Sequence, residues 1–295
     1  MKFCVSYYKD FRYNDVVDEI VFSYANFNDG IVNEMKNWKD EQRIIIDICY
    51  GGEPKIIPIL QMCKKKHENL VIRLSTNMEN MVKKLQEAGL PYFFSNYAKT
   101  ADEVYSMIKR GATDVYVTEN LGFNLKDIGF YCKSKRISVR VIPNIAQYAA
   151  GFGEEVPDAY KFFVRPEDVD LYDQYVNVFE IVCPNNKLSV TYEIYRNGVW
   201  TGDLGQLIIG LREPFYNSGI VDYFGEARIK CQHRCMQEKC QLCQNMKELA
   251  GRLYENNLAI ESDRKEWKSE TKSYQEIVQL AEKTITNNDV KVSQE

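Results

Sequence analysis

The stretch with the densest reactive chemistry is a group of four cysteines between residues 231 and 243. Four of the nine cysteines of the chain fall within these thirteen residues, in the pattern C-x3-C-x4-C-x2-C. Thiolates this close in sequence can converge on one inorganic centre, and zinc and iron–sulfur clusters both take four sulfur ligands. The spacing therefore predicts a metal or cluster site, and it leaves zinc and a 4Fe–4S cluster both open. The four predicted ligands, called the cysteine quartet below, are Cys231, Cys235, Cys240 and Cys243.

Core packing and disulfide bonding are the alternatives to metal binding for the cysteine quartet. The residues between these cysteines are mostly polar, among them Gln232, His233, Arg234 and Lys239, which makes a buried apolar environment a poor fit. Disulfides need an oxidising compartment, and the first residues of the chain lack the apolar core of a secretory signal. We therefore expect a cytoplasmic protein with reduced thiols.

Net charge and hydropathy limit the kinds of molecule that the protein is expected to bind. The chain has 295 residues and a net charge of −4, so it has no global basic surface for non-specific nucleic-acid binding, although a local basic groove stays open. No apolar run approaches the roughly 20 residues that a membrane helix needs, and we expect no membrane partner. The length allows one large α/β domain or two ordinary ones.

The strands and helices that would position these residues are predicted from the alternation of strand-like and helix-like sequence patterns. Short β-branched runs recur along the first part of the chain, and the segments between them have helical periodicity. Eight such units favour a closed (β/α)8 TIM-like barrel over an open doubly wound sheet, because no glycine-rich phosphate loop follows an early strand. The eight predicted strands are Phe3 to Tyr8, Ile44 to Cys49, Val71 to Ser75, Tyr92 to Ser95, Asp114 to Thr118, Ile137 to Ile142, Lys161 to Val164 and Val178 to Val182.

Other segments complete the predicted organisation. The long first interval, 9–43, is expected to hold two helices, and Asn197-Gly198 predicts a hairpin between Val190–Tyr195 and Val199-Trp200. The chain then divides into a barrel (1–187), a hairpin and connecting segment (188–230), the cysteine motif (231–243), and a helical tail with a disordered end (244–295).

Candidate site residues follow from the barrel, because its active site lies at the carboxyl ends of the strands. As catalytic residues we expect Arg165 as an anion anchor, with Glu180 or Glu119 as an acid or base. As substrate-binding residues we expect Arg73, Asn96 and Asn144. Each of them could instead have a purely structural role, since asparagines often form turns, an arginine pairs with a nearby carboxylate, and a glutamate caps a helix.

The usual hydrolytic machinery is hard to assemble from this sequence. There are only two histidines, His67 in a lysine-rich helix and His233 within the cysteine quartet, so a nucleophile with a histidine base is difficult to build. Cys49 and Cys183 end predicted strands and could face the barrel mouth, but packing roles fit them better.

Several of these segments resemble the collagenase-like U-type peptidase family. The resemblance rests on the helix and strand of Ala101–Val117, on Ile137–Asn144, on Phe163–Glu167, on Val178–Ile181, and on Cys231-x3-Cys235 preceded by Arg228. It covers roughly residues 90 to 240.

The resemblance implies a barrel with a four-cysteine iron–sulfur cluster. Members of the family are named peptidases, and several act in the hydroxylation of RNA bases or ubiquinone precursors. This chain departs from the family pattern at Cys183-Pro-Asn-Asn, which lacks the expected motif, and at Cys240 and Cys243, which follow the shared cysteine pair.

Three functions therefore stand as hypotheses. The first is an iron–sulfur barrel enzyme that acts in hydroxylation of RNA or a related small aromatic substrate. The second is a non-catalytic binding or scaffold protein with a structural Cys4 zinc site. The third is peptide hydrolysis, the activity in the family name.

Overall fold

The computed structural model describes residues 1–24, 38–49, 56–117, 125–144, 164–183, 185–200, 207 and 209. The cysteine quartet, Glu119 and the predicted helical tail lie outside these residues. The chain divides into two compact units, one of Met1–Ile142 with Asp173–Val182 and the other of Pro143–Tyr172 with Cys183–Glu295. No helix among the described residues is both long and apolar enough to span a bilayer.

The first unit is built on a nine-stranded sheet in which every pairing is parallel. Its order is β5-β4-β3-β2-β1-β9-β8-β7-β6. The strands are β1 (Lys2–Ser6), β2 (Glu19–Ser23), β3 (Arg43–Asp47), β4 (Val71–Leu74), β5 (Tyr92–Phe94), β6 (Tyr97–Ala98), β7 (Asp114–Val117), β8 (Ser138–Val141) and β9 (Val178–Ile181).

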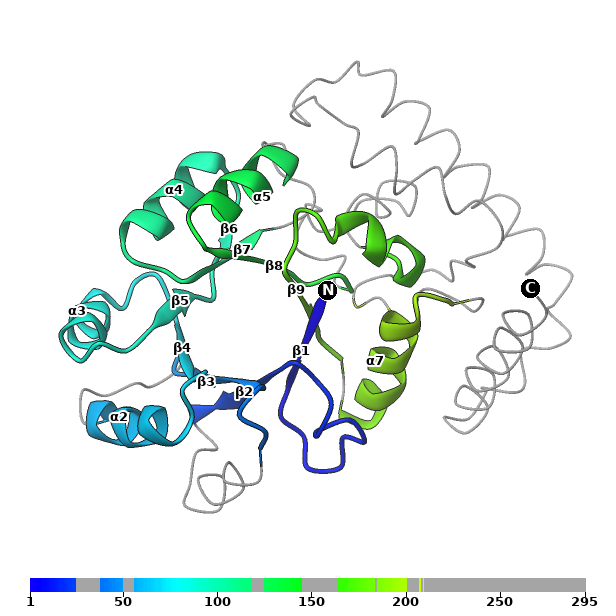
Figure 1. Ribbon diagram of the computed structural model, residues 1–295, viewed down its shortest axis with the longest axis horizontal. Helices are drawn as coiled ribbons and strands as arrows, with labels where there is room; N and C mark the ends of the chain where they lie inside the picture. The colour runs from blue at the N-terminus through cyan, green and yellow to red at the C-terminus, as the bar shows by residue number, and fades with distance from the viewer. Residues whose placement is uncertain are drawn as a thin grey trace, which may run out of the picture. The chain divides into compact units, whose positions relative to one another are not determined.

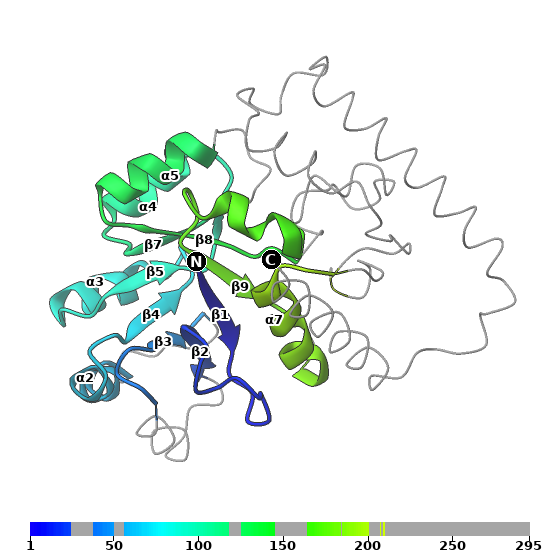
Figure 2. The same ribbon diagram turned by 45° about the vertical axis from the view of Figure 1, so that its right-hand side comes forward.

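The sheet curls into a nearly closed barrel. Only Ser95 and Asn96 separate β5 from β6, and the N–H of Thr113, the residue before β7, donates to the Tyr92 carbonyl of β5 at 2.8 Å. Helices α2 (Ile57–Lys66), α3 (Glu79–Glu87), α4 (Ala101–Lys109) and α5 (Leu125–Ser134) lie outside the ring of strands (Figure 1, Figure 2). The parallel barrel predicted from the β/α alternation is thus confirmed.

Three strands differ from the prediction, and one of them is the two-residue β6, which was not predicted. The interval 9–43, expected to hold two helices, contains β2, whose central residues are fully apolar and buried. Of the predicted strand at 161–164, residues 161–163 lie outside the described residues, and Val164 is not in a strand. Within the described part of the chain β8 pairs directly with β9, with Arg140 opposite Val178.

The hairpin predicted around Asn197-Gly198 is wrong, because the second unit has a helix there. Its described elements are the 3-10 helices η5 (Pro166–Tyr172) and η6 (Asn185–Lys187) and helix α7 (Leu188–Asn197). Most of α7 is buried, and at its end the Gly198 N–H donates to the Ile194 carbonyl four residues earlier, as in a helix. Gly198 ends α7 in the left-handed region at φ 69°, so Asn-Gly forms a helix C-cap here instead of a hairpin turn.

Three helices of the first unit end in the same hydrogen-bonding pattern. After α3, α4 and α5, paired backbone N–H groups bond back to the last turn, and the residue at the turn has positive φ. Two of these turns use glycine, Gly89 (66°) and Gly111 (93°), whereas the third uses Arg136 (59°). Arg136 is the one non-glycine residue with positive φ among those described.

Substitutions at two of these turns measure the free-energy cost of the left-handed backbone conformation for a residue other than glycine. Arg136→Gly should raise the free energy of unfolding by up to about 1 kcal/mol, because glycine tolerates the left-handed conformation. Gly89→Ala should lower it by about 1 kcal/mol. A Cβ at position 89 would meet nothing within 4 Å, so this second change isolates backbone strain.

Both values can be measured by urea unfolding followed by circular dichroism. If Arg136→Gly destabilises the protein, its side chain makes stabilising contacts, and the expectation is wrong.

Candidate functional site

The interior of the barrel holds a network of buried charges. Side chains alternate between the two faces of a strand, so every second residue of each strand points inward. In most barrels these positions carry branched apolar residues, but here seven of them are charged. They are Glu19, Arg43, Asp47, Arg73, Asp114, Arg140 and Glu180.

One half of the network gathers at the amino ends of the strands, and we call it the lower layer (Glu19, Arg43, Asp114 and Arg140). The first three are the first residues of their strands, and Arg140, the third residue of β8, contacts Glu19 and Asp114 through its guanidinium. The Arg43 guanidinium donates to both oxygens of Asp114, each at 2.6 Å. Arg140 donates to Glu19 at 2.6 Å and to Asp114 at 3.2 Å. The side chain of Arg140 is completely buried, and its guanidinium lies 5.0 Å above the Phe93 ring.

The other half lies at the carboxyl ends, and we call it the upper layer (Asp47, Arg73, Tyr116 and Glu180). Arg73 donates to Asp47 at 2.6 Å, to Glu180 at 2.7 Å and to the Tyr116 hydroxyl at 3.0 Å. Tyr116 in turn donates its hydroxyl hydrogen to the second oxygen of Glu180. Arg73 is 14% exposed and Asp47 is 16% exposed, so the upper layer is reachable from solvent.

The charge states of the upper layer follow from these contacts. Burial alone would raise the pKa of Glu180, but the charges of Arg73 and Arg140 outweigh it and lower that pKa. Burial, followed by the charge of Glu180, raises the pKa of Tyr116. At neutral pH Glu180 is therefore a carboxylate and Tyr116 a neutral donor. An ionised Glu180 fits a role as base or electrostatic stabiliser better than one as acid.

Two of the predicted site residues meet directly, since Arg73 and Glu180 form an ion pair across the barrel although they are far apart in sequence. Asn96 is exposed, and its side-chain oxygen accepts from the Thr76 N–H at 2.8 Å, so it braces a loop. Glu119 and the cysteine quartet lie outside the described residues, and their roles stay predictions.

Two further predicted residues belong to the second unit. Arg165 is buried and donates through Nε and Nη2 to Asp168, both at 2.7 Å, so it makes the pairing with a nearby carboxylate that a structural role would require. Asn144 is completely buried and donates to the Leu207 carbonyl at 3.3 Å. Their predicted roles toward a substrate stay predictions.

Sequence reasoning missed Asp47 and Tyr116. Asp47 ends the apolar run Ile44–Ile46, so a carboxylate at the carboxyl end of a strand was a usable signal. Tyr116 is two residues after Asp114 and therefore on the same face of β7, but an isolated tyrosine in a strand suggests packing.

The described cysteines are poor nucleophiles. Burial, together with a hydrogen bond to Asp47, raises the pKa of Cys49 to about 12. Burial raises the pKa of Cys183 to about 11 and that of Cys4, inside the barrel, well above its usual value. Thiols with such pKa values are protonated at neutral pH and react slowly. No group of three or more metal-ligating side chains occurs among the described residues.

Comparisons with known proteins add little to this geometry. No family model and no curated protein matches the chain. One similar solved structure is an enolase superfamily member from Agrobacterium tumefaciens, with a TM-score of 0.42 and 12% identity over 65% of this chain and 52% of the other.

Two further structures have comparable values. The one described as native KDPGal has a TM-score of 0.40 and 13% identity, and covers 67% of this chain and 96% of its own. A cube-shaped designed protein cage has a TM-score of 0.41 and 12% identity, and covers 67% and 73%. The fold assignment therefore rests on the strand pairing, and the resemblance to the U-type peptidase family remains a hypothesis.

Arg140→Met should lower the free energy of unfolding by about 3–5 kcal/mol, because it leaves the buried Glu19 carboxylate without the arginine that donates to it at 2.6 Å. Arg136→Gln removes the same charge at an exposed position and should change it by less than about 0.5 kcal/mol. Urea unfolding of both variants measures the difference. Equal effects would show that the buried network contributes little to stability.

Proposed function

We propose that this chain is a TIM-like parallel-barrel enzyme whose reaction takes place at the carboxyl ends of the strands, over the upper layer. The observation that supports this best is Arg73, which is held between Asp47 and Glu180 and is still partly exposed. Barrel enzymes place their active sites at this end. A cation fixed by carboxylates on two different strands can orient a polar substrate without moving.

The donors of the upper layer suggest what it recognises. The Nε of Arg73 is buried and has no hydrogen-bond partner within the described part of the chain, which is unusual for such a group. The Arg73 guanidinium therefore keeps a donor for an oxygen-rich group of a substrate, whereas the one hydrogen of the Tyr116 hydroxyl is already donated to Glu180. RNA bases and small aromatic acids both carry such groups.

The cofactor proposed for this enzyme is a 4Fe–4S cluster bound by the cysteine quartet. Its support is the spacing of the four cysteines and the family resemblance, which also suggests hydroxylation of RNA or a related aromatic substrate. An iron–sulfur cluster supplies electron transfer, while the barrel residues bind and orient the substrate. Zinc at the same four thiolates would serve a structural role instead.

One observation favours the second candidate, a non-catalytic binding protein with a structural Cys4 zinc site. Both carboxylates of the upper layer are engaged by Arg73, so neither is poised as a base without rearrangement. Peptide hydrolysis has less support, because the thiols of Cys49 and Cys183 both have raised pKa values.

Metal content decides between the first two candidates. Protein purified without oxygen should contain about four irons per chain and absorb near 400 nm, as thiolate–iron clusters do. Cys240→Ser should lose most of this iron, whereas Cys49→Ser, a thiol outside the quartet, should keep it. One zinc per chain and no iron would overturn the iron–sulfur proposal and favour the binding protein.

The proposed active site of the barrel is tested separately, by measuring RNA hydroxylation in cells. We expect cells expressing the protein to contain a hydroxylated nucleoside that control cells lack, detected by mass spectrometry of digested RNA. Asp47→Asn, which removes the negative charge paired with Arg73, should lower the yield of this nucleoside by roughly 10²–10³-fold, as loss of a positioned charge does at other active sites.

Asp40→Asn is the matched control, because this carboxylate is exposed and lies just before β3, away from the upper layer. Circular dichroism should show that both variants fold. Full activity of Asp47→Asn would overturn the site, and identical RNA from expressing and control cells would overturn the RNA substrate.

A further inference from the structure

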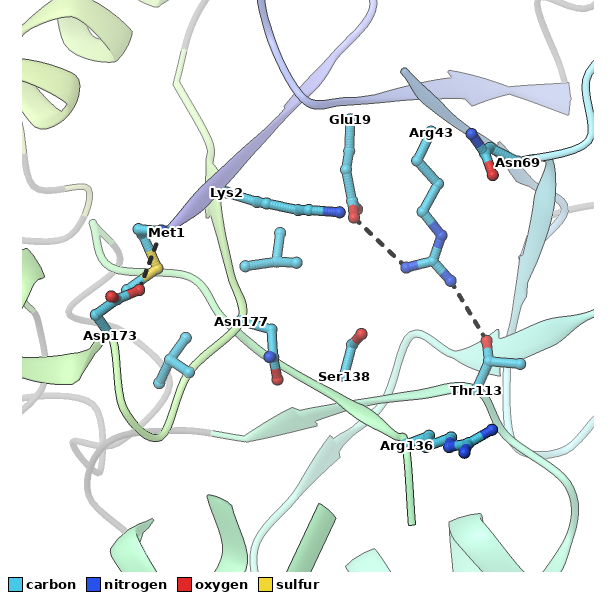
Figure 3. A pocket seen from close by; sticks show the side chains of 12 residues that line it. Met1, Lys2, Glu19, Arg43, Asn69, Thr113, Arg136, Ser138, Asp173 and Asn177 are labelled. Carbon is cyan, nitrogen blue, oxygen red and sulfur yellow. Dashed lines mark hydrogen bonds and ion pairs between the residues drawn. The ribbon is translucent and has the colours of Figure 1, made fainter. Parts of the chain in front are cut away.

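The end of the barrel opposite the upper layer carries a pocket that the proposed function does not use. Its volume is about 520 Å³, within the range of small-molecule sites. It is lined by the first residues of several strands and the turns before them, including Lys2, Glu19, Arg43, Thr113, Arg136 and Ser138. We call it the amino-end pocket (Figure 3).

The charges of the amino-end pocket do not cancel. Glu19 is offset by Arg140 at 2.6 Å, while Arg43 is offset by Asp114 at 2.6 Å. Asp173 contacts the Met1 amino group at 3.0 Å. Within the described residues the side chains of Lys2 and Arg136 have no ion-pair partner. Two positive charges therefore remain at this pocket in a chain whose net charge is −4.

Neutral donors accompany these two cations. Ser138 lines the pocket and offers its hydroxyl. The side-chain oxygen of Asn177 accepts from the Val139 N–H at 2.8 Å, which leaves the amide NH₂ of Asn177 as a donor at the pocket. Figure 3 shows Lys2, Glu19, Arg43 and Ser138 pointing into the pocket and Arg136 at its edge.

Arg136 gives independent support for a role in binding. The equivalent turns after α3 and α4 use glycine, whereas this turn holds an arginine in the left-handed region, at a local cost in stability. A strained residue of this kind is more often found where its side chain has a task. Its guanidinium offers a planar fork of donors, the geometry that suits phosphate oxygens.

We propose that the amino-end pocket binds the phosphate group of a small phosphomonoester, held by Lys2 and Arg136. A phosphomonoester carries close to two negative charges at neutral pH and so matches both cations, whereas a single carboxylate would match one. The volume leaves room for a body of sugar size beside the phosphate. Because this end of a barrel is remote from the carboxyl ends of its strands, such a ligand would stabilise or regulate the protein and not react.

Calorimetric titration of the full chain tests this directly, with inorganic phosphate, glycerol 3-phosphate and ribose 5-phosphate as probes. Binding by the phosphates and none by ribose supports the proposal. No binding by any phosphate up to about 10 mM, a very weak affinity, overturns it. Binding by citrate alone overturns it as well, because citrate offers only carboxylates.

Variants locate the ligand. Arg136→Gln and Lys2→Gln should each weaken ribose 5-phosphate binding at least about tenfold, the usual order for a charge-assisted contact. Arg136→Lys should retain part of it. Lys135→Gln removes the same charge from an exposed neighbour that does not line the pocket, and it should bind like the unchanged protein. An equal loss in Lys135→Gln would reveal general attraction and overturn the site.

Arg136→Gly separates binding from folding. It should lose binding as Arg136→Gln does, while its melting temperature stays the same or rises because the strain at this turn is relieved. Unchanged binding in Arg136→Gly would remove Arg136 from the site. None of these measurements depends on activity or on metal, so their failure leaves the proposed enzyme function untouched.

Discussion

The structure of the first unit depends on three arginines and four carboxylates buried inside a parallel barrel. An isolated charge in such a place would cost several kcal/mol, so each must be paired and hydrogen-bonded to persist. Arg140 is the residue that joins the two layers. It contacts Glu19 and Asp114 below and lies 3.7 Å from Glu180 above, with none of its side chain exposed. The two ends of the barrel are electrostatically connected through this one side chain.

This arrangement has a consequence at each end of the barrel. Each layer exposes part of one arginine, Arg73 (14%) at the carboxyl ends and Arg43 (20%) at the amino ends. An apolar interior would have left both ends without fixed charges. Because these side chains are already held by carboxylates, they are ordered before any ligand arrives, which lowers the entropy lost on binding.

Much of the fold could be predicted from the sequence because its signals are local. Apolar runs such as Ile44–Ile46 are what a strand covered on both faces requires. β2 has an apolar centre of the same length, Ile20–Phe22, but it was missed because the whole interval 9–43 was assigned to helices. The Asn197-Gly198 dipeptide was misassigned because it serves both hairpin turns and helix ends, and the bond from the Gly198 N–H to the Ile194 carbonyl shows that it ends a helix here.

The site was less predictable because its contacts are not local. Arg73 and Glu180 were both candidates from their positions near strand ends, but nothing in one sequence shows that they pair with each other. The alternation of side chains does place Asp114 and Tyr116 on one face of β7. Which face points into the barrel depends on the register between strands, such as Tyr116 opposite Arg140, and that register is set by the closed sheet as a whole.

The charge state of the buried carboxyl groups also makes the stability of the barrel depend on pH. Burial would raise the pKa values of Asp47, Asp114 and Glu180, but the neighbouring arginines lower all three. A carboxyl group with a lowered pKa in the folded protein binds protons more weakly there than in the unfolded chain. Its stabilising contribution is therefore complete above the unfolded pKa and is lost as the pH falls through the folded one. At neutral pH these three carboxylates are charged, and their ion pairs across the barrel interior hold Arg43 and Arg73 in place.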